Sequence, residues 1–192
     1  MRLRTERILC IVRRLLLLMI ALLLVAPAQA AEPLPRALPA SALPALQSRS
    51  RPLTVAALAS ETVNHAGLRL VLAQGGYRAG SEREFYGRTA SFNHVTARVL
   101  RFDDAAGASR YLSWVRGHAK ESLGSPRAVT ALGIGTGGFV YRPRGCGCHS
   151  DVPTFLMAWR RGPLVASLLA SGSGATARSV GTLARALDRS TS

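Results

Sequence analysis

The chain has 192 residues, of which 25 are Lys or Arg and 10 are Asp or Glu, with a formal net charge of +15. Its length and its hydrophobic content of 48% suit one globular domain with a real core and exclude a large multidomain enzyme. The basic residues are scattered, without a long run or an interleaved aromatic stripe, which argues against a dedicated nucleic-acid-binding surface.

Residues 1–30 have the three parts of a secretory signal peptide. Arginines come first, residues 15–26 form an unbroken apolar run, and residues 28–30 match the small-x-small cleavage pattern. Because the apolar run is shorter than the roughly 20 residues of a membrane-spanning helix, we expect cleavage before Ala31 and no stable membrane span afterwards. The mature chain is therefore expected in the periplasm, at the cell surface or outside the cell.

The segment after the cleavage site is rich in proline and alanine. Four prolines within residues 31–51 disfavour a regular helix and favour an extended chain. We therefore predict a linker over 31–51 and one α+β domain over 52–192. Without residues 1–30 the formal charge is about +11, since that segment holds five arginines and one glutamate. This charge fits either a polyanionic partner or simply a solvated surface, and export argues against nucleic acid as that partner.

In the first half of the domain, the sequence pattern predicts helical structure followed by two strands. Residues 56–74 have helix-forming composition, with Gly67 as the point that divides two short helices and Gly75-Gly76 as the stop. Residues 77–86 and 91–102 are predicted strands, the second rich in β-branched and aromatic side chains.

The second half repeats this change from helix to strands. Asp103 and Asp104 begin a helix with an apolar stripe that ends at Ala119. Residues 128–134 and 139–142 are predicted strands joined by a glycine turn.

The chain closes with a hairpin and a helix. Residues 155–159 and 164–170 are apolar runs on either side of a turn, and residues 175–189 have an apolar helical stripe. We expect Trp159 and Leu187 to be buried. Runs of strands between helices predict an α+β fold, with an antiparallel sheet and helices packed mainly on one face.

Several stretches resemble small exported domains found in GC-rich bacteria. They are GGYRAG at 75–80, VLRFDDAAGA at 99–108, and Leu132-Gly133 before an aromatic strand, an apolar hairpin and a closing helix. Such domains include uncharacterised lipoproteins and the extracellular sensor domains of membrane kinases. The resemblance implies an extracytoplasmic α+β domain that binds or senses a ligand, and it brings no catalytic residue with it.

The most distinctive motif is a thiol loop in which Cys146, Cys148 and His149 are separated by a single glycine or none. Outside the cytoplasm paired thiols tend to oxidise, so we prefer a Cys146–Cys148 disulfide. The alternatives are a copper or zinc site, to which Asp151 would add a ligand, and thiol exchange. The spacing is tighter than that of ordinary zinc sites.

Other candidate motifs have plainer interpretations. Residues 133–138 match the dinucleotide fingerprint by spelling, but an aromatic strand follows instead of the required helix, so we predict a strand connection. His65, His94 and His118 are interpreted as surface or capping side chains.

Three functions remain open from the sequence. The first is a non-catalytic binding or interaction domain with an unknown envelope or extracellular ligand, for which we expect either a groove between sheet and helices or an exposed aromatic patch. The second is a thiol or metal protein that uses Cys146, Cys148 and His149. The third is an envelope hydrolase, for which Glu82 and Glu84 share one face of a strand but lack a predicted cleft.

Intact mass of protein recovered after export tests the expected N-terminus and the thiol loop together. We expect a chain that starts at Ala31, is lighter by two hydrogens than the fully reduced chain, and carries no stoichiometric metal. Alkylation of both Cys146 and Cys148 without a reductant contradicts the disulfide. Copper or zinc that co-purifies one-to-one and is lost in Cys148→Ser establishes the metal site instead.

Overall fold

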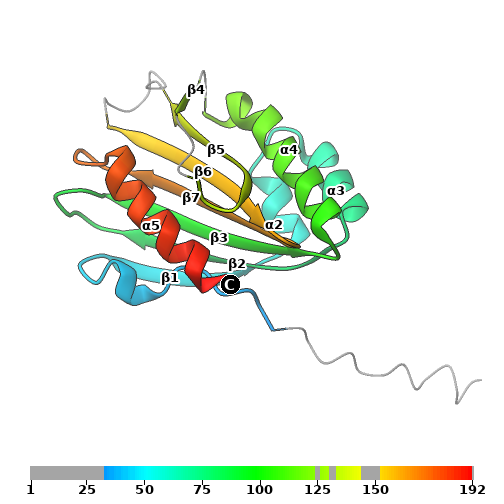
Figure 1. The fold of residues 1–192 in the computed structure, drawn as a ribbon, viewed down its shortest axis with the longest axis horizontal. Coiled ribbons are helices and arrows are strands. Elements are labelled where there is room, and N and C mark those ends of the chain that lie inside the picture. The colour runs from blue at the N-terminus through cyan, green and yellow to red at the C-terminus, as the bar shows by residue number, and fades with distance from the viewer. Residues whose placement is uncertain (1–32, 124–125, 130–132, 144–151, 192) are drawn as a thin grey trace, which may run out of the picture. The chain divides into compact units, whose positions relative to one another are not determined.

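One antiparallel sheet organises the computed structural model, which describes residues 33–123, 126–129, 133–143 and 152–191. Within these residues the sheet has seven strands in the order β1-β2-β3-β7-β6-β5-β4 (Figure 1). Two antiparallel meanders, β1-β2-β3 and β4-β5-β6-β7, join where β3 pairs with β7. The strands are β1 Gln47–Leu53, β2 Tyr77–Tyr86, β3 His94–Phe102, β4 Pro126–Val129, β5 Thr136–Pro143, β6 Thr154–Arg161 and β7 Leu164–Ser171.

Helices cover both faces of this sheet, unequally. Alternate residues of β3 point to opposite faces. Leu100 and Phe102 share one core with α2 (Val55–Ser60), α3 (His65–Gln74) and α4 (Ala105–Leu123). On the other face, Val95, Ala97 and Val99 share a second core with α5 (Ala177–Ser190). The predicted α+β fold and antiparallel sheet are confirmed, with α5 as the helix that lies apart from the others.

The folded part begins earlier than the predicted boundary at residue 52. Strand β1 pairs with β2 along its whole length, and Leu38 and Leu46 are buried in the core beneath α5. A short 3-10 helix, η1 (Ala40–Ala42), lies between these two leucines. The four prolines of 31–51 all precede β1, so they did not exclude a strand that begins at Gln47. Pro52 lies within β1, where it is tolerated because one row of backbone N–H groups in an edge strand has no partner strand.

Capping residues set the boundary between α2 and α3. The predicted division at Gly67 is wrong, because Gly67 lies within α3. Thr54 accepts a hydrogen bond from the Ala57 N–H at 3.1 Å, and Asn64 accepts one from the Gly67 N–H at 2.9 Å. Each side chain satisfies a backbone donor that the first helical turn leaves open, so the chain restarts as α3 after Asn64.

The closing hairpin and helix follow the prediction closely. Trp159 is 1% exposed and Leu187 0% exposed, both in the core beneath α5. Thr176 caps α5 through a reciprocal capping box with Ser179. The Trp159 indole N–H donates to Asp188 at 3.0 Å, which ties β6 to α5. In the described ranges, no helix is both long and apolar enough to cross a membrane.

Candidate functional site

A cleft of about 290 Å³ opens between the sheet and the three helices α2, α3 and α4. A groove between sheet and helices was one of the two features that the binding-domain interpretation of the sequence expected. Its wall combines apolar side chains with hydroxyl groups and one ion-paired arginine. The lining residues are Leu58, Glu61, Thr62, Leu68, Thr96, Arg98, Tyr111, Trp114, Val115, Leu156, Ser167 and Leu169.

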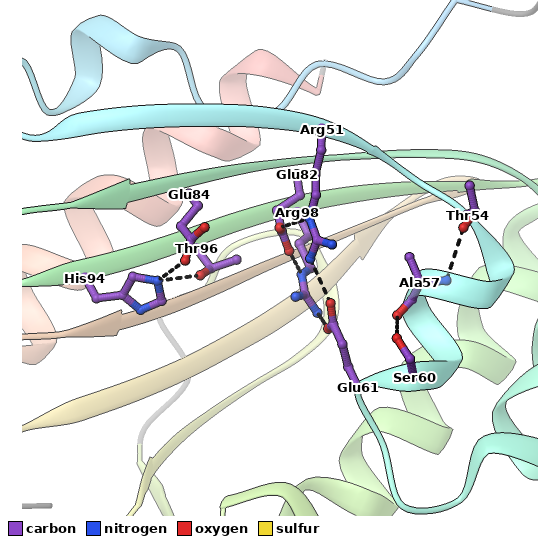
Figure 2. Close-up of polar contacts among 10 residues, drawn as sticks. All are labelled: Arg51, Thr54, Ala57, Ser60, Glu61, Glu82, Glu84, His94, Thr96 and Arg98. Atoms are coloured by element: carbon purple, nitrogen blue, oxygen red, sulfur yellow. Dashed lines mark hydrogen bonds and ion pairs between the residues drawn. The ribbon is translucent and has the colours of Figure 1, made fainter.

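Beside this cleft, four charged side chains close into a ring of ion pairs, which we call the charge ring: Arg51, Glu82, Arg98 and Glu61 (Figure 2). Arg51 Nε lies 2.6 Å from one Glu82 oxygen, and Arg98 Nε lies 2.5 Å from the other. Arg51 Nη2 and Arg98 Nη1 reach the two oxygens of Glu61 at 2.9 and 2.6 Å. Every carboxylate oxygen of the ring therefore has a guanidinium partner.

Strand register brings these residues together. Arg51 of β1 lies directly opposite Glu82 of β2, which in turn lies opposite Arg98 of β3. Glu61 is the residue that ends α2, and it reaches the two arginines from the helical layer. The charge ring thus joins three neighbouring strands to the end of a helix, as Figure 2 shows.

Glu82 is held ionised within this ring, although its side chain is only 4% exposed. Burial alone would raise the pKa of Glu82, but the hydrogen bonds and charges of Arg51 and Arg98 outweigh burial and lower the pKa. Burial likewise would lower the pKa of Arg98, and the charges of Glu61 and Glu82 raise it instead. Two positive and two negative charges therefore persist side by side and cancel.

Tyr111 contributes a hydroxyl to the wall of the cleft. The residue is 9% exposed and its ring packs against Phe102 with centroids 5.4 Å apart. Within the described ranges, no side chain or backbone group forms a hydrogen bond with its hydroxyl, which remains reachable from the cleft. Burial raises the pKa of Tyr111 to about 12, so the hydroxyl is neutral at physiological pH and available as a donor.

The predicted metal and disulfide residues Cys146, Cys148 and His149 lie outside the described residues, as does Asp151. The disulfide, the copper or zinc site and thiol exchange therefore stay predictions from the sequence. Elsewhere in the chain, the described residues contain no group of three or more His, Cys, Asp or Glu side chains placed to hold a metal ion.

The three histidines have local roles. His65 Nδ1 lies 2.6 Å from the Ala59 carbonyl oxygen, and His118 Nδ1 lies 3.0 Å from the Trp114 carbonyl oxygen. The His118 ring also stacks on Trp114 with centroids 4.2 Å apart. His94 Nε2 lies 2.8 Å from Glu84, on the sheet face that carries the charge ring. These contacts agree with surface and capping roles.

The glycine-rich stretch at 133–138 leads into a strand. Gly133, Gly135 and Gly137 have positive φ angles of 65°, 56° and 65°, a region that glycine enters without steric cost. Strand β5 begins at Thr136, so the helix that a dinucleotide site requires after its glycines is not formed here. The strand connection was the correct interpretation.

Sequence reasoning noted Glu82 but did not connect it with Arg51, Arg98, Glu61 or Tyr111. One signal was present: Arg98 is a charged residue in the middle of β3, a strand with buried side chains on both faces. A charged residue in such a strand requires a partner, because an unpaired buried charge is costly. The identity of that partner depends on register, which the sequence pattern does not reveal.

Comparisons with known proteins support the fold. No protein-family model and no curated protein matches the chain. Among solved structures, it is similar to the extracellular domain of PknH, a kinase from Mycobacterium tuberculosis, with a TM-score of 0.50 and 14% identity. The match covers 80% of this chain and 91% of that one. At this identity the likeness concerns the fold alone, and it agrees with the resemblance to extracellular sensor domains.

Glu82→Gln tests the charge ring through the pH dependence of stability. Because folding lowers the Glu82 pKa, its stabilisation is complete above the ordinary value of 4.5 and disappears as pH falls through the folded-state pKa. We expect Glu82→Gln to lower the free energy of unfolding by about 1.5–3 kcal/mol at neutral pH. The difference from wild type should shrink below pH 4.5.

Glu84→Gln is the matched control, two residues along the same strand and more exposed, with His94 as its partner. It should lower the free energy of unfolding by less than about 1 kcal/mol, because exposed ion pairs contribute little to stability. If urea unfolding shows that both substitutions lower the free energy of unfolding equally, the charge ring does not stabilise the fold more than an exposed ion pair does.

Proposed function

We propose that the protein is an exported, non-catalytic binding domain whose ligand enters the cleft between the sheet and α2, α3 and α4. The signal-peptide pattern of residues 1–30 and the likeness of fold to an extracellular domain support export. A concave site with apolar walls and a few convergent polar groups supports binding at the cleft.

The hydroxyl of Tyr111 carries this proposal. Tyr111 is nine-tenths buried as a residue and lines the cleft, and within the described ranges its hydroxyl forms no hydrogen bond with another protein group. Among the described residues, the buried side-chain atom without a partner is Asn93 Oδ1, so the Tyr111 hydroxyl is open to the cleft, where water can bond to it. A ligand in the cleft would replace that water as the hydrogen-bond partner.

The charge ring favours binding over hydrolysis. A general acid or base needs a carboxyl group that can exchange a proton near the working pH. Both oxygens of Glu61 and both oxygens of Glu82 are paired with guanidinium groups, and the pKa of Glu82 is lowered rather than raised. These carboxylates serve the architecture of the cleft, so we do not assign them to an envelope hydrolase.

The thiol and metal function of Cys146, Cys148 and His149 remains the second proposal, supported by the sequence motif itself. A polyanionic partner, also expected from the charge of the chain, would be bound elsewhere, since the charges beside the cleft cancel.

A fragment screen by NMR, with cleft-filling variants, tests the proposed site. Leu169→Trp puts an indole into the cleft, and Leu70→Trp makes the same change on the exposed side of α3, where Leu70 is 57% exposed. We expect fragments to shift the backbone amides of cleft residues in wild type and Leu70→Trp, and not in Leu169→Trp. Fragments that shift cleft amides equally in Leu169→Trp, or that never shift them, would refute the site.

A further inference from the structure

We infer that the ligand of the cleft is an uncharged, polyhydroxylated molecule, of the class of a neutral mono- or disaccharide. This inference rests on the proposed function and narrows it to one chemistry. It follows from the charge balance of the cleft, from its hydroxyl groups and from its apolar wall.

The charge balance disfavours a strongly charged ligand. Among the described residues Arg98 is the one cation that lines the cleft, and its Nε and Nη1 atoms already hold Glu82 and Glu61. The ring has no net charge to attract an ion, and an ion that displaced Glu82 or Glu61 from Arg98 would leave a charge of the ring without one of its partners. Breaking one partner from a buried ion pair is strongly unfavourable, so a neutral ligand fits the intact ring best.

Hydroxyl groups line the cleft from four parts of the fold: Tyr111 from α4, Ser167 from β7, Thr96 from β3 and Thr62 from the turn after α2. Within the described ranges Tyr111 and Ser167 form no side-chain hydrogen bond, and Thr96 reaches only His94 at a long 3.4 Å. An acyl chain or a hydrocarbon would cover these hydroxyls without bonding to them. A molecule rich in hydroxyl groups supplies both donors and acceptors.

The remaining wall is apolar and contains an aromatic ring. Trp114 and Val115 of α4 and Leu156 and Leu169 of the sheet line the cleft. A sugar ring presents C–H groups on its faces and hydroxyl groups around its rim, which matches an apolar wall bordered by polar groups. The volume of about 290 Å³ lies at the small end of ligand pockets, which suits one small unit rather than a long chain.

Tryptophan fluorescence can follow this binding. The chain has two tryptophans, and Trp159 lies buried in the core beneath α5, so a ligand in the cleft should change the emission of Trp114. The probes are methyl glycosides of glucose, galactose, mannose and N-acetylglucosamine. Glucuronic acid, glucosamine and octanoate are the charged and acyl comparators, all at millimolar concentration.

We expect at least one neutral glycoside to bind, with a signal that disappears in Trp114→Phe, and the comparators to bind more weakly. Tyr111→Phe and Ser167→Ala should each weaken the binding of that glycoside about tenfold, the typical effect of one lost hydrogen bond. Tyr77→Phe is the matched control, because the Tyr77 hydroxyl donates to the Leu53 carbonyl oxygen instead of lining the cleft.

The outcomes separate this inference from the proposed function. If octanoate or a charged probe occupies the cleft while the neutral glycosides do not, the saccharide inference fails and the binding domain stands. If a glycoside binds with equal affinity to wild type, Tyr111→Phe and Ser167→Ala, the saccharide inference fails as well. If neither these probes nor any screened fragment shifts the cleft amides, both proposals fail.

Discussion

The charge ring is the interaction on which the site depends. Arg51, Glu82 and Arg98 lie in one row across β1, β2 and β3, and Glu61 reaches this row from the end of α2. The ring therefore fixes an edge strand and a helix end to the same point of the sheet. Hydrophobic burial of Leu58 and Ala59 holds α2 against the core, but such burial is not directional. The four ion pairs depend on geometry, so they fix the position of the end of α2 over the sheet. Two of their members, Arg98 and Glu61, form part of the wall of the cleft.

The same ring gives the cleft its chemical character. A row of paired charges with no net charge gives neither anions nor cations a net attraction, and the arginines hold Glu82 ionised by lowering its pKa. What remains available to a ligand is the neutral hydroxyl of Tyr111, the hydroxyl of Ser167 and an apolar wall. On the opposite face, α5 packs onto Val95, Ala97 and Val99 and forms a closed core. Both faces of the sheet carry a hydrophobic core, and the proposed binding site lies on the face covered by α2, α3 and α4.

Much of the fold was readable from local patterns. The predicted strand 77–86 coincides with β2, and the apolar hairpin and closing helix were placed within a few residues. These elements have strong periodicity and clear turn residues, which are local properties. Strand β1 was missed because Gln47–Leu53 is polar and exposed, and only its pairing with β2 makes it a strand. The division between α2 and α3 was misplaced because Asn64 was not considered as a cap.

The candidate site was less predictable, for a physical reason. Residues 51, 61, 82 and 98 come from four elements, and the register of three strands decides whether their charges meet. Alternation along β2 showed that Glu82 and Glu84 share a face, yet their surroundings differ. Glu82 lies between two arginines, whereas Glu84 meets His94 at a more exposed position. Tyr111 belonged to an ordinary apolar helical stripe, and only the structure shows that its hydroxyl lines a cleft without bonding to another described residue.

Amide hydrogen exchange of Glu82→Gln tests most directly whether the charge ring holds α2 over the cleft. If the ring fixes α2, the Leu58 amide, which donates to the Thr54 carbonyl oxygen, should exchange about tenfold faster or more in the variant. The Val180 amide, which donates to the Thr176 carbonyl oxygen in α5, should keep its rate on the opposite face. Unchanged exchange at Leu58, or equal acceleration at both amides, would contradict the account.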